Sequence, residues 1–345
     1  MPKNSIEYYK IYETYKKGGG IRLDTSRLVV SSSPHLHGGA STRTIMLDVL
    51  IALLPALVAS VWLFGWRALA VELVCVAACI AAESLSCAVL RKPQSAGDLS
   101  CVVTGVLLAF NLPVTIPLWQ AALGGVVAIV VVKAMFGGIG QNFVNPALAG
   151  RIVLMASFPD TMNTWTMPVQ FQGADAVSSA TPLAQMAAGG LDIGPMQLFF
   201  GIHPGCLGET CAAALILGGL YLVIRRVISP VIPLCYIGTV FVLTWLLGRN
   251  PLEQILSGGL LLGAIFMATD YTTSPINKSG KVVFAILIGL ITVLIRLYGS
   301  LTEGVSFAIL IGNILVPLIE RATRPRAFGV KRKNLLAGRL GGHER

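Results

Sequence analysis

The chain has little charge for its length. Asp, Glu, Lys and Arg make up 12% of its 345 residues, whereas hydrophobic residues make up 54%, and the mean hydropathy is +0.75. A soluble globular domain carries charge on roughly 25% of its residues because those side chains face water. The composition therefore excludes an ordinary soluble domain and predicts an integral membrane protein.

Several ligand and catalytic patterns are also missing. The seven cysteines include no Cys-x-x-Cys pair, which is a common spacing for iron-sulfur ligands. The chain has no P-loop, no His-Glu-x-x-His and no nucleophile elbow, so we predict neither a metal site nor a catalytic residue. His35 and His37 are favoured as polar residues at the membrane surface. A disulfide between Cys206 and Cys211 is left open but is not favoured.

Ten apolar runs predict the architecture. A helix needs about 20 apolar residues to cross the hydrocarbon core, and shorter runs are allowed where a helix stops partway. The sequence thus predicts an all-α polytopic membrane protein with ten transmembrane helices, separated mostly by Pro and Gly. The predicted spans are approximately Ile45–Phe64, Ala68–Leu90, Leu99–Leu112, Ile116–Phe136, Val144–Phe158, Leu207–Ile224, Val231–Leu247, Leu252–Ala268, Val282–Leu297 and Val305–Ile319.

The positive charges predict the orientation of the chain. If the N-terminus is cytoplasmic, 22 of the 26 Lys and Arg residues fall inside, Arg67 and Arg249 fall outside, and Arg151 and Arg296 lie within spans. This asymmetry follows the positive-inside rule and predicts both termini in the cytoplasm. The net charge of +10 is mainly a topology signal, with attraction to acidic membrane lipid as a secondary effect. It gives no support for nucleic-acid binding.

The two halves of the chain resemble each other. Five predicted spans precede a long polar loop and five follow it, so the halves would enter the membrane from opposite sides as a five-plus-five inverted repeat. The third span of each half is short and contains glycine: SCVVTGVLLAFNLP starts at Ser100 and SGGLLLGAIFMATD at Ser257. Such pairs point to a midplane binding site, although glycine also serves close helix packing.

These observations divide the chain into five predicted parts. They are a cytoplasmic N-terminal tail (1–43), a first five-helix half (44–158), an external loop (159–206), a second five-helix half (207–322) and a basic cytoplasmic tail (323–345).

The external loop contains the most specific motif, DAVSSATPLA from Asp175 to Ala184. A threonine hydroxyl such as that of Thr181 is a poor nucleophile until it is activated, and the small residues before it would let a modifying enzyme approach the backbone. Pro182 keeps the following turn from continuing a preceding helix. A structural interpretation stays open, in which Thr181 caps a helix whose first turn carries Pro182.

The same loop resembles a known attachment site. Asp175, Ser178, Ala180 and Thr181 match the motif Asp-x-x-Ser-(Gly or Ser)-Ala-Thr of proteins that a flavin transferase modifies, with Ser179 where Gly is commoner. In such proteins the threonine hydroxyl displaces AMP from FAD and keeps FMN through a phosphodiester. The resemblance therefore implies covalent FMN on Thr181.

Further stretches extend the resemblance over nearly the whole chain. SSSPHLH starts at Ser31, FGGIGQNFVNPALAGR at Phe136 and YGSLTEGVSFAILIGN at Tyr298. They resemble the family of the Rnf ion-translocating oxidoreductase D subunit and of the B subunit of the sodium-translocating NADH:quinone reductase. This implies a subunit of the bacterial inner membrane that relays electrons within a complex, which couples electron transfer between ferredoxin and NAD to translocation of Na⁺ or H⁺ and is not active as a single chain.

The resemblance also implies partners. They are the other subunits of the Rnf complex, especially the G subunit with its own covalent FMN on the external side, and the flavin transferase during maturation.

Three more polar residues are candidate cofactor ligands. Arg151 lies in a predicted span, where an unpaired charge costs about 2.5–3.5 kcal/mol, so we expect it to face a cavity or a partner, and a structural ion pair is the alternative. Asn142 and Asn145 can both donate and accept hydrogen bonds, as a flavin ring requires, but a turn and an N-cap before Pro146 are also open. If these asparagines hold a flavin, their cytoplasmic position makes it a second, noncovalent one, such as riboflavin.

Glu72 and Glu83 are the deepest acidic residues in the predicted spans. Ionisable residues inside a membrane are functional candidates, and these two could mark an ion path. A solute or ion channel or transporter without a redox role is the rival interpretation of the whole chain, because an inverted repeat also describes such proteins. Thr181 separates the two interpretations, since a channel has no need of an attached flavin.

Overall fold

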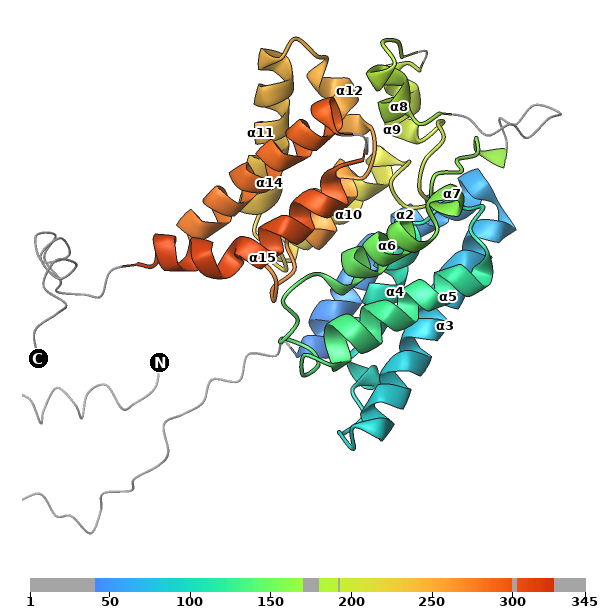
Figure 1. Ribbon diagram of the computed structural model, residues 1–345, viewed down its shortest axis with the longest axis vertical. Helices are drawn as coiled ribbons and strands as arrows, with labels where there is room; N and C mark the ends of the chain where they lie inside the picture. The colour runs from blue at the N-terminus through green and yellow to red at the C-terminus, as the bar shows by residue number, and fades with distance from the viewer. Residues whose placement is uncertain (1–40, 170–179, 192, 300–302, 326–345) are drawn as a thin grey trace, which may run out of the picture. The chain divides into compact units, whose positions relative to one another are not determined.

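The computed structural model describes residues 41–169, 180–191, 193–299 and 303–325. All of these lie in one compact unit that begins at Ser41. The regular secondary structure in the described ranges is helical (Figure 1), so the prediction of an all-helical fold is confirmed. Asp175, Ser178, His35 and His37 lie outside the described residues.

Within the described ranges, four helices are long and apolar enough to cross a membrane: α2 (Thr42–Phe64), α3 (Trp66–Val89), α14 (Lys278–Tyr298) and α15 (Val305–Thr323). Large apolar side chains on these helices face outward, such as Val58, which is 64% exposed, and Leu73, which is 60% exposed. Large exposed apolar surfaces on a folded protein are sites of contact with a partner or with lipid. The chain is a membrane-embedded multi-pass protein.

Shorter apolar helices fill most of the remaining predicted runs. They are α4 (Ser100–Phe110), α5 (Leu118–Val127) with its continuation η3 (Ala128–Ala134), α6 (Pro146–Ser157), α10 (Ala212–Ile224) and α11 (Val231–Leu246). The eighth run is divided into α12 (Pro251–Leu256), α13 (Leu260–Leu262) and η5 (Gly263–Met267). The segments η3 and η5 are π-helical, a wider turn that is frequent at functional sites.

The described residues between these helices also form short elements, namely η2 (Ala96–Asp98), α7 (Pro159–Met162), α8 (Pro182–Ala187) and α9 (Pro195–Phe200). The last three begin with proline, which has no N–H to leave unpaired at a helix start. Capping residues fix other helix starts: Asn145 Oδ1 accepts from the Ala147 N–H at 3.0 Å at the start of α6. Local sequence therefore sets where these helices begin.

The core contains two short helical stretches, one from each half of the chain. All but one residue of α4 and every residue from Leu260 to Met267 are buried. Each stretch follows a residue in the left-handed region, Leu99 (φ +65°) or Gly258 (φ +66°). Their C-terminal ends meet, because Asn111 Nδ2 lies 3.7 Å from Met267 Sδ.

The helices of the two halves also pack in matching ways. In the first half α3 packs against α4 and α5, and α5 with η3 packs against α6; in the second half α11 packs against α12 and α14, and α14 packs against α15. Glycine allows the last contact in each half: a methyl group at Gly150 would lie 2.8 Å from the Gly124 carbonyl oxygen, and one at Gly312 would lie 2.4 Å from Ile288 Cγ2. Helices α2 and α10 join the two halves.

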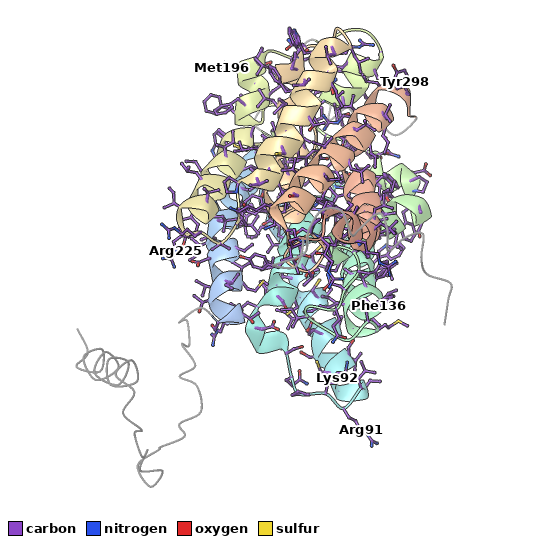
Figure 2. The ribbon with its side chains drawn as sticks, turned by 90° about the vertical axis from the view of Figure 1, so that its left-hand side faces the viewer. Arg91, Lys92, Phe136, Met196, Arg225 and Tyr298 are labelled. Carbon is purple, nitrogen blue, oxygen red and sulfur yellow. The ribbon has the colours of Figure 1, made fainter. Side chains whose placement is uncertain are left out.

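Labelled residues mark the two ends of the helices in Figure 2. Arg91, Lys92 and Phe136 lie at one end, and Met196 and Tyr298 lie at the opposite end (Figure 2). The first end carries two of the basic residues that the sequence assigns to the cytoplasm. Helices α8 and α9 lie towards the other end, near α12 (Figure 1).

Candidate functional site

Thr181 is buried at the start of α8. Its side chain is 6% exposed, and its Oγ1 accepts a hydrogen bond from the Ala184 N–H at 3.3 Å. The N-cap that the sequence left open is therefore present, with Pro182 in the first turn. The neighbouring Ala180 is exposed, and its carbonyl accepts from Gln185 Nε2 at 3.0 Å.

Helix α8 packs against the break between α12 and α13. A methyl group at Gly258 would lie 2.6 Å from Leu183 Cδ1, so only glycine leaves room for Leu183 at this place. Gly258 also has a positive φ, which glycine adopts without steric cost. A second contact joins Gln254 Nε2 of α12 to Met186 Sδ at 3.5 Å.

Arg296 lies on the other side of Gly258. Its Nη1 donates to the Gln254 carbonyl at 2.5 Å and its Nη2 to the Ser257 carbonyl at 3.1 Å. The side chain is buried in the last turn of α14, where the helix dipole favours a positive charge. The guanidinium thus contacts two backbone carbonyls at the break against which α8 packs.

Residues on the elements that form this junction have buried polar atoms without a hydrogen-bond partner. Within the described residues they include Gln185 Oε1, Gln254 Oε1, Ser257 Oγ and Arg296 Nε. A buried unsatisfied polar group costs about 1–3 kcal/mol, so several together indicate a place that takes a polar ligand. Donors and acceptors are both present, which fits the phosphate and the mixed ring edges of a flavin mononucleotide.

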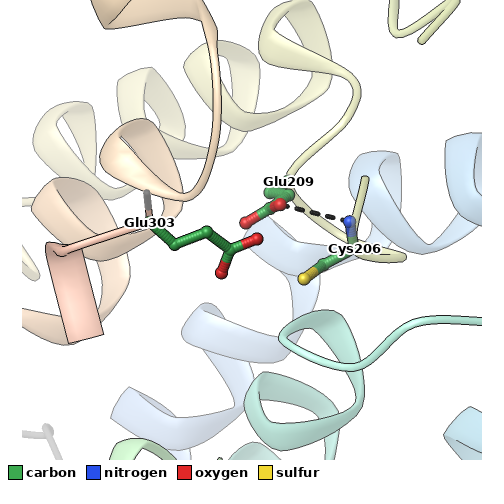
Figure 3. A group of neighbouring side chains, drawn as sticks. All are labelled: Cys206, Glu209 and Glu303. Carbon is green, nitrogen blue, oxygen red and sulfur yellow. Dashed lines mark hydrogen bonds between the residues drawn. The ribbon is translucent and has the colours of Figure 1, made fainter. Parts of the chain in front are cut away.

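A second buried cluster contains Cys206, Glu209 and Glu303 (Figure 3). One ligand atom from each lies within 4.8 Å of the others, and Glu209 Oε1 accepts from the Cys206 N–H at 3.1 Å. Arg151 forms an ion pair with Glu303 and donates to Asn111 Oδ1 at 2.7 Å. The carboxylate of Glu303 is thus paired with an arginine, as the structural alternative for Arg151 expected.

Burial disfavours the charged forms of two side chains in this region, Cys206 and His203. Burial raises the pKa of the Cys206 thiol well above its usual value, and burial lowers the pKa of His203. A metal-binding cysteine must lose its proton, which this environment opposes. Cys206 and Cys211 are both free thiols.

Asn142 and Asn145 line a cavity to which Thr181 does not contribute. The cavity has a volume of about 360 Å³, and Asp270 and other residues from α2, α4 and η5 also line it. Asn145 Nδ2 donates to the Met267 carbonyl at 3.3 Å, and Asn142 Nδ2 donates to the Val144 carbonyl at 3.1 Å. Arg151 is six residues beyond Asn145 on α6, about 9 Å along the axis, and it is not among the residues that line this cavity.

The two acidic candidates on α3 have different surroundings. Glu83 is paired with Lys133 of η3 at 2.7 Å and accepts from Ser95 Oγ at 2.5 Å. Glu72 accepts from Ser60 Oγ at 2.5 Å, and its Oε2 has no partner among the described residues. The pair of Glu83 and Lys133 borders a second cavity of about 200 Å³.

The sequence did not identify Lys133 or Ser257 as candidate site residues. It placed Arg296 in a predicted span but assigned no role to this residue. A lysine within IVVVKAMF and an arginine within VLIRLYG are visible as charges in apolar runs. Their partners are 50 and about 40 residues away in the sequence, so only the structure identifies them.

Helices with lipid-facing apolar sides and charged sites buried inside define a polytopic membrane protein. The chain matches the model of the NQR2, RnfD, RnfE family over residues 29–329, and it belongs to this family.

Three relatives are similar over most of their length. The D subunit of the Na(+)-translocating ferredoxin:NAD(+) oxidoreductase complex of Acetobacterium woodii is 48% identical, over 89% of this chain and 97% of its own. The D subunit of the proton-translocating ferredoxin:NAD(+) oxidoreductase complex of Clostridium ljungdahlii is 40% identical, and the match covers 88% of this chain and 96% of the relative. The D subunit of the ion-translocating oxidoreductase complex of Stutzerimonas stutzeri is 39% identical, and the match covers 84% of this chain and 93% of the relative.

Proposed function

We propose that the chain is the D subunit of an ion-translocating ferredoxin:NAD oxidoreductase complex and that it carries covalent FMN on Thr181. The names and coverage of the relatives support the first part. The second part is carried by Thr181 of the attachment motif, and it is supported by the packing of α8, whose Leu183 lies with Arg296 Nη2 close to Gly258, and by unpartnered polar atoms on α8, α12 and α14. The subunit relays electrons between the redox groups of its partners.

Attachment uses FAD as the co-reactant. The Thr181 oxygen attacks the flavin-side phosphorus, the bond from that phosphorus to the bridging oxygen breaks, AMP leaves, and the hydroxyl proton passes to a base of the flavin transferase. An ester oxygen keeps a lone pair and can still accept from the Ala184 N–H, so the N-cap and the attachment are compatible. Because Thr181 is buried, the transferase must reach it before α8 packs against α12.

The chain's residues would hold the cofactor and keep water away from it. FMN supplies one-electron and two-electron chemistry when bound. Gln185, Gln254 and Ser257 offer side-chain oxygens to its polar edges, and Arg296 offers an N–H. Leu183, packed on Gly258, closes the junction between α8 and the broken helix.

The topology that we propose has ten spans, cytoplasmic termini and the Thr181 loop on the external side. The basic residues at one end of the helices support it, with α8 near the other (Figures 1 and 2). The matching packing of the two halves supports an inverted repeat. In this topology the external FMN of the G subunit is the direct electron partner of the flavin on Thr181.

A second, noncovalent flavin such as riboflavin would fit the cavity lined by Asn142 and Asn145. Its volume of about 360 Å³ lies within the range of small-molecule sites, roughly 300–1,000 Å³. Asn145 is already committed to α6 and to Met267, so Asn142 is the better candidate ligand. Denaturation releases noncovalent flavin but not covalent flavin. Asn142→Ala should therefore release less flavin than the wild type on denaturation, while the flavin bound covalently to the chain is unchanged. Equal loss of both flavins would contradict this site.

The coupling ion is a separate question, because the relatives' names differ: one translocates Na⁺ and one translocates protons. Of the two acidic candidates for an ion path, Glu72 keeps an unpartnered oxygen, whereas Glu83 is paired with Lys133. Glu72→Gln should therefore slow ion transport without removing an ion pair, whereas Glu83→Gln would also break the pair with Lys133.

Ultraviolet fluorescence of the denatured chain on a gel tests the redox function. Protein from cells that contain the flavin transferase should give a fluorescent band, and Thr181→Ala should be dark. Thr164→Ala, which changes another threonine of the same loop, should stay fluorescent. A dark wild-type band would favour the channel interpretation.

A further inference from the structure

Arg296 is a buried cation that forms no ion pair in the described part of the chain. The described ion pairs join Lys133 to Glu83, Arg151 to Glu303 and Arg225 to Asp48. Arg296 is 6% exposed, and both of its Nη atoms donate only to backbone carbonyls, which bring dipoles and no full charge. A buried charge without a counter-charge is strongly unfavourable, so an anionic group is expected to pair with it.

That anionic group must reach Arg296 from the side of α8. A methyl group on Gly258 would touch Leu183 on one side and Arg296 Nη2 on the other, at 2.6 and 3.2 Å. Thr181 is two residues before Leu183 and is buried with it. Glu209 approaches the next residue, Gly259, and its charge acts on Arg296 from a distance, but the two side chains do not form an ion pair.

We propose that Arg296 is the counter-charge of the phosphodiester on Thr181. The inference rests on the proposed attachment of FMN and adds the residue that recognises its phosphate. A phosphodiester carries one negative charge and acceptor oxygens, and arginine pairs with phosphate through charge-assisted hydrogen bonds. The two backbone contacts fix the guanidinium plane, and the Nε–H remains free to donate.

The pairing links attachment of the flavin to the stability of this end of the fold. Before attachment, Arg296 is an uncompensated charge beneath α8. After attachment, the phosphodiester compensates it and joins α8 to Gln254 and Ser257 through one side chain. Arg296 therefore opposes the packing of α8 in the unloaded chain and favours it in the loaded chain, so its effect on stability changes sign.

Thermal unfolding of the full chain in one detergent tests this change of sign. Each variant is produced with and without the flavin transferase, and loading is verified by intact mass. Loaded wild-type protein should unfold several degrees above unloaded protein. Arg296→Gln should remove most of this difference, lowering the midpoint of the loaded form and raising or preserving that of the unloaded form, while Arg296→Lys should keep a large part of it.

Arg151→Gln is the matched control, because Arg151 already has Glu303 as its partner. It should lower the midpoint of both forms equally. If Arg296→Gln destabilises the unloaded chain as much as Arg151→Gln does, Arg296 already has a sufficient counter-charge in the protein, such as Glu209, and the inference is wrong. If wild-type chain made with the transferase shows no added mass, the proposed attachment itself fails.

Discussion

Two regions of the molecule bury a positive charge and surround it differently. Lys133 meets Glu83 at 2.7 Å and Ser100 Oγ at 2.6 Å, so its charge and its donors are satisfied by side chains. Arg296 meets two backbone carbonyls and no anion within the described residues. The first arrangement is complete as it stands, whereas the second is complete only with a ligand. A buried ion pair is thus a sign of packing, and a buried charge without one is a sign of a binding site.

Lys133→Met gives the largest expected effect. It leaves Glu83 buried without its partner, which costs about 3–5 kcal/mol, and thermal unfolding or the yield of folded protein should show the loss. The double variant with Glu83→Gln should recover most of it, because no charge is then left behind. A single variant as stable as the wild type would show that water reaches this pair and that the contrast with Arg296 is false.

Gly258→Ala should cause the second largest loss of stability. Its positive φ disfavours alanine by roughly 1–2 kcal/mol, and the new methyl group would press on Leu183 at 2.6 Å, so we expect a total near 2–3 kcal/mol. Gly248→Ala is the control, since Gly248 also has a positive φ but has nothing within 4 Å of a new methyl group. Equal unfolding midpoints for the two variants would mean that α8 does not pack on Gly258.

Arg225→Ala should have the smallest effect. Arg225 pairs with Asp48 at 3.3 Å, but its side chain is 54% exposed, and exposed ion pairs contribute about 0–1 kcal/mol. The unfolding midpoint should hardly move. A loss as large as that of Lys133→Met would contradict the view that burial decides the value of these pairs.

The sequence was sufficient for the features that depend on neighbouring residues. Apolar runs located the helices, Asn145 before Pro146 was recognised as an N-cap alternative, and the loop motif drew attention to Thr181. Each of these signals lies within about one or two turns of the chain. The eighth run was also recognised as short and glycine-containing, although its division into three pieces at Ser257 and Gly258 was not foreseen.

Long-range partners could not be predicted. Arg151 was expected to have a partner, but Glu303 is 152 positions away in the sequence, and nothing local connects the two. The pairing of Lys133 with Glu83 depends on how η3 packs against α3. The cofactor roles of Arg151, Asn142 and Asn145 stay predictions, and Asp175 and Ser178 lie outside the described residues.

The central claim is that Thr181 carries FMN in the native complex. Tandem mass spectrometry of the peptide that contains Asp175–Ala184, from protein purified out of its own membrane, tests this claim most directly. The account predicts one FMN, attached through its phosphate, with fragment ions that place the added mass on Thr181. An unmodified Thr181 in that peptide, or FMN on another residue, would contradict the account.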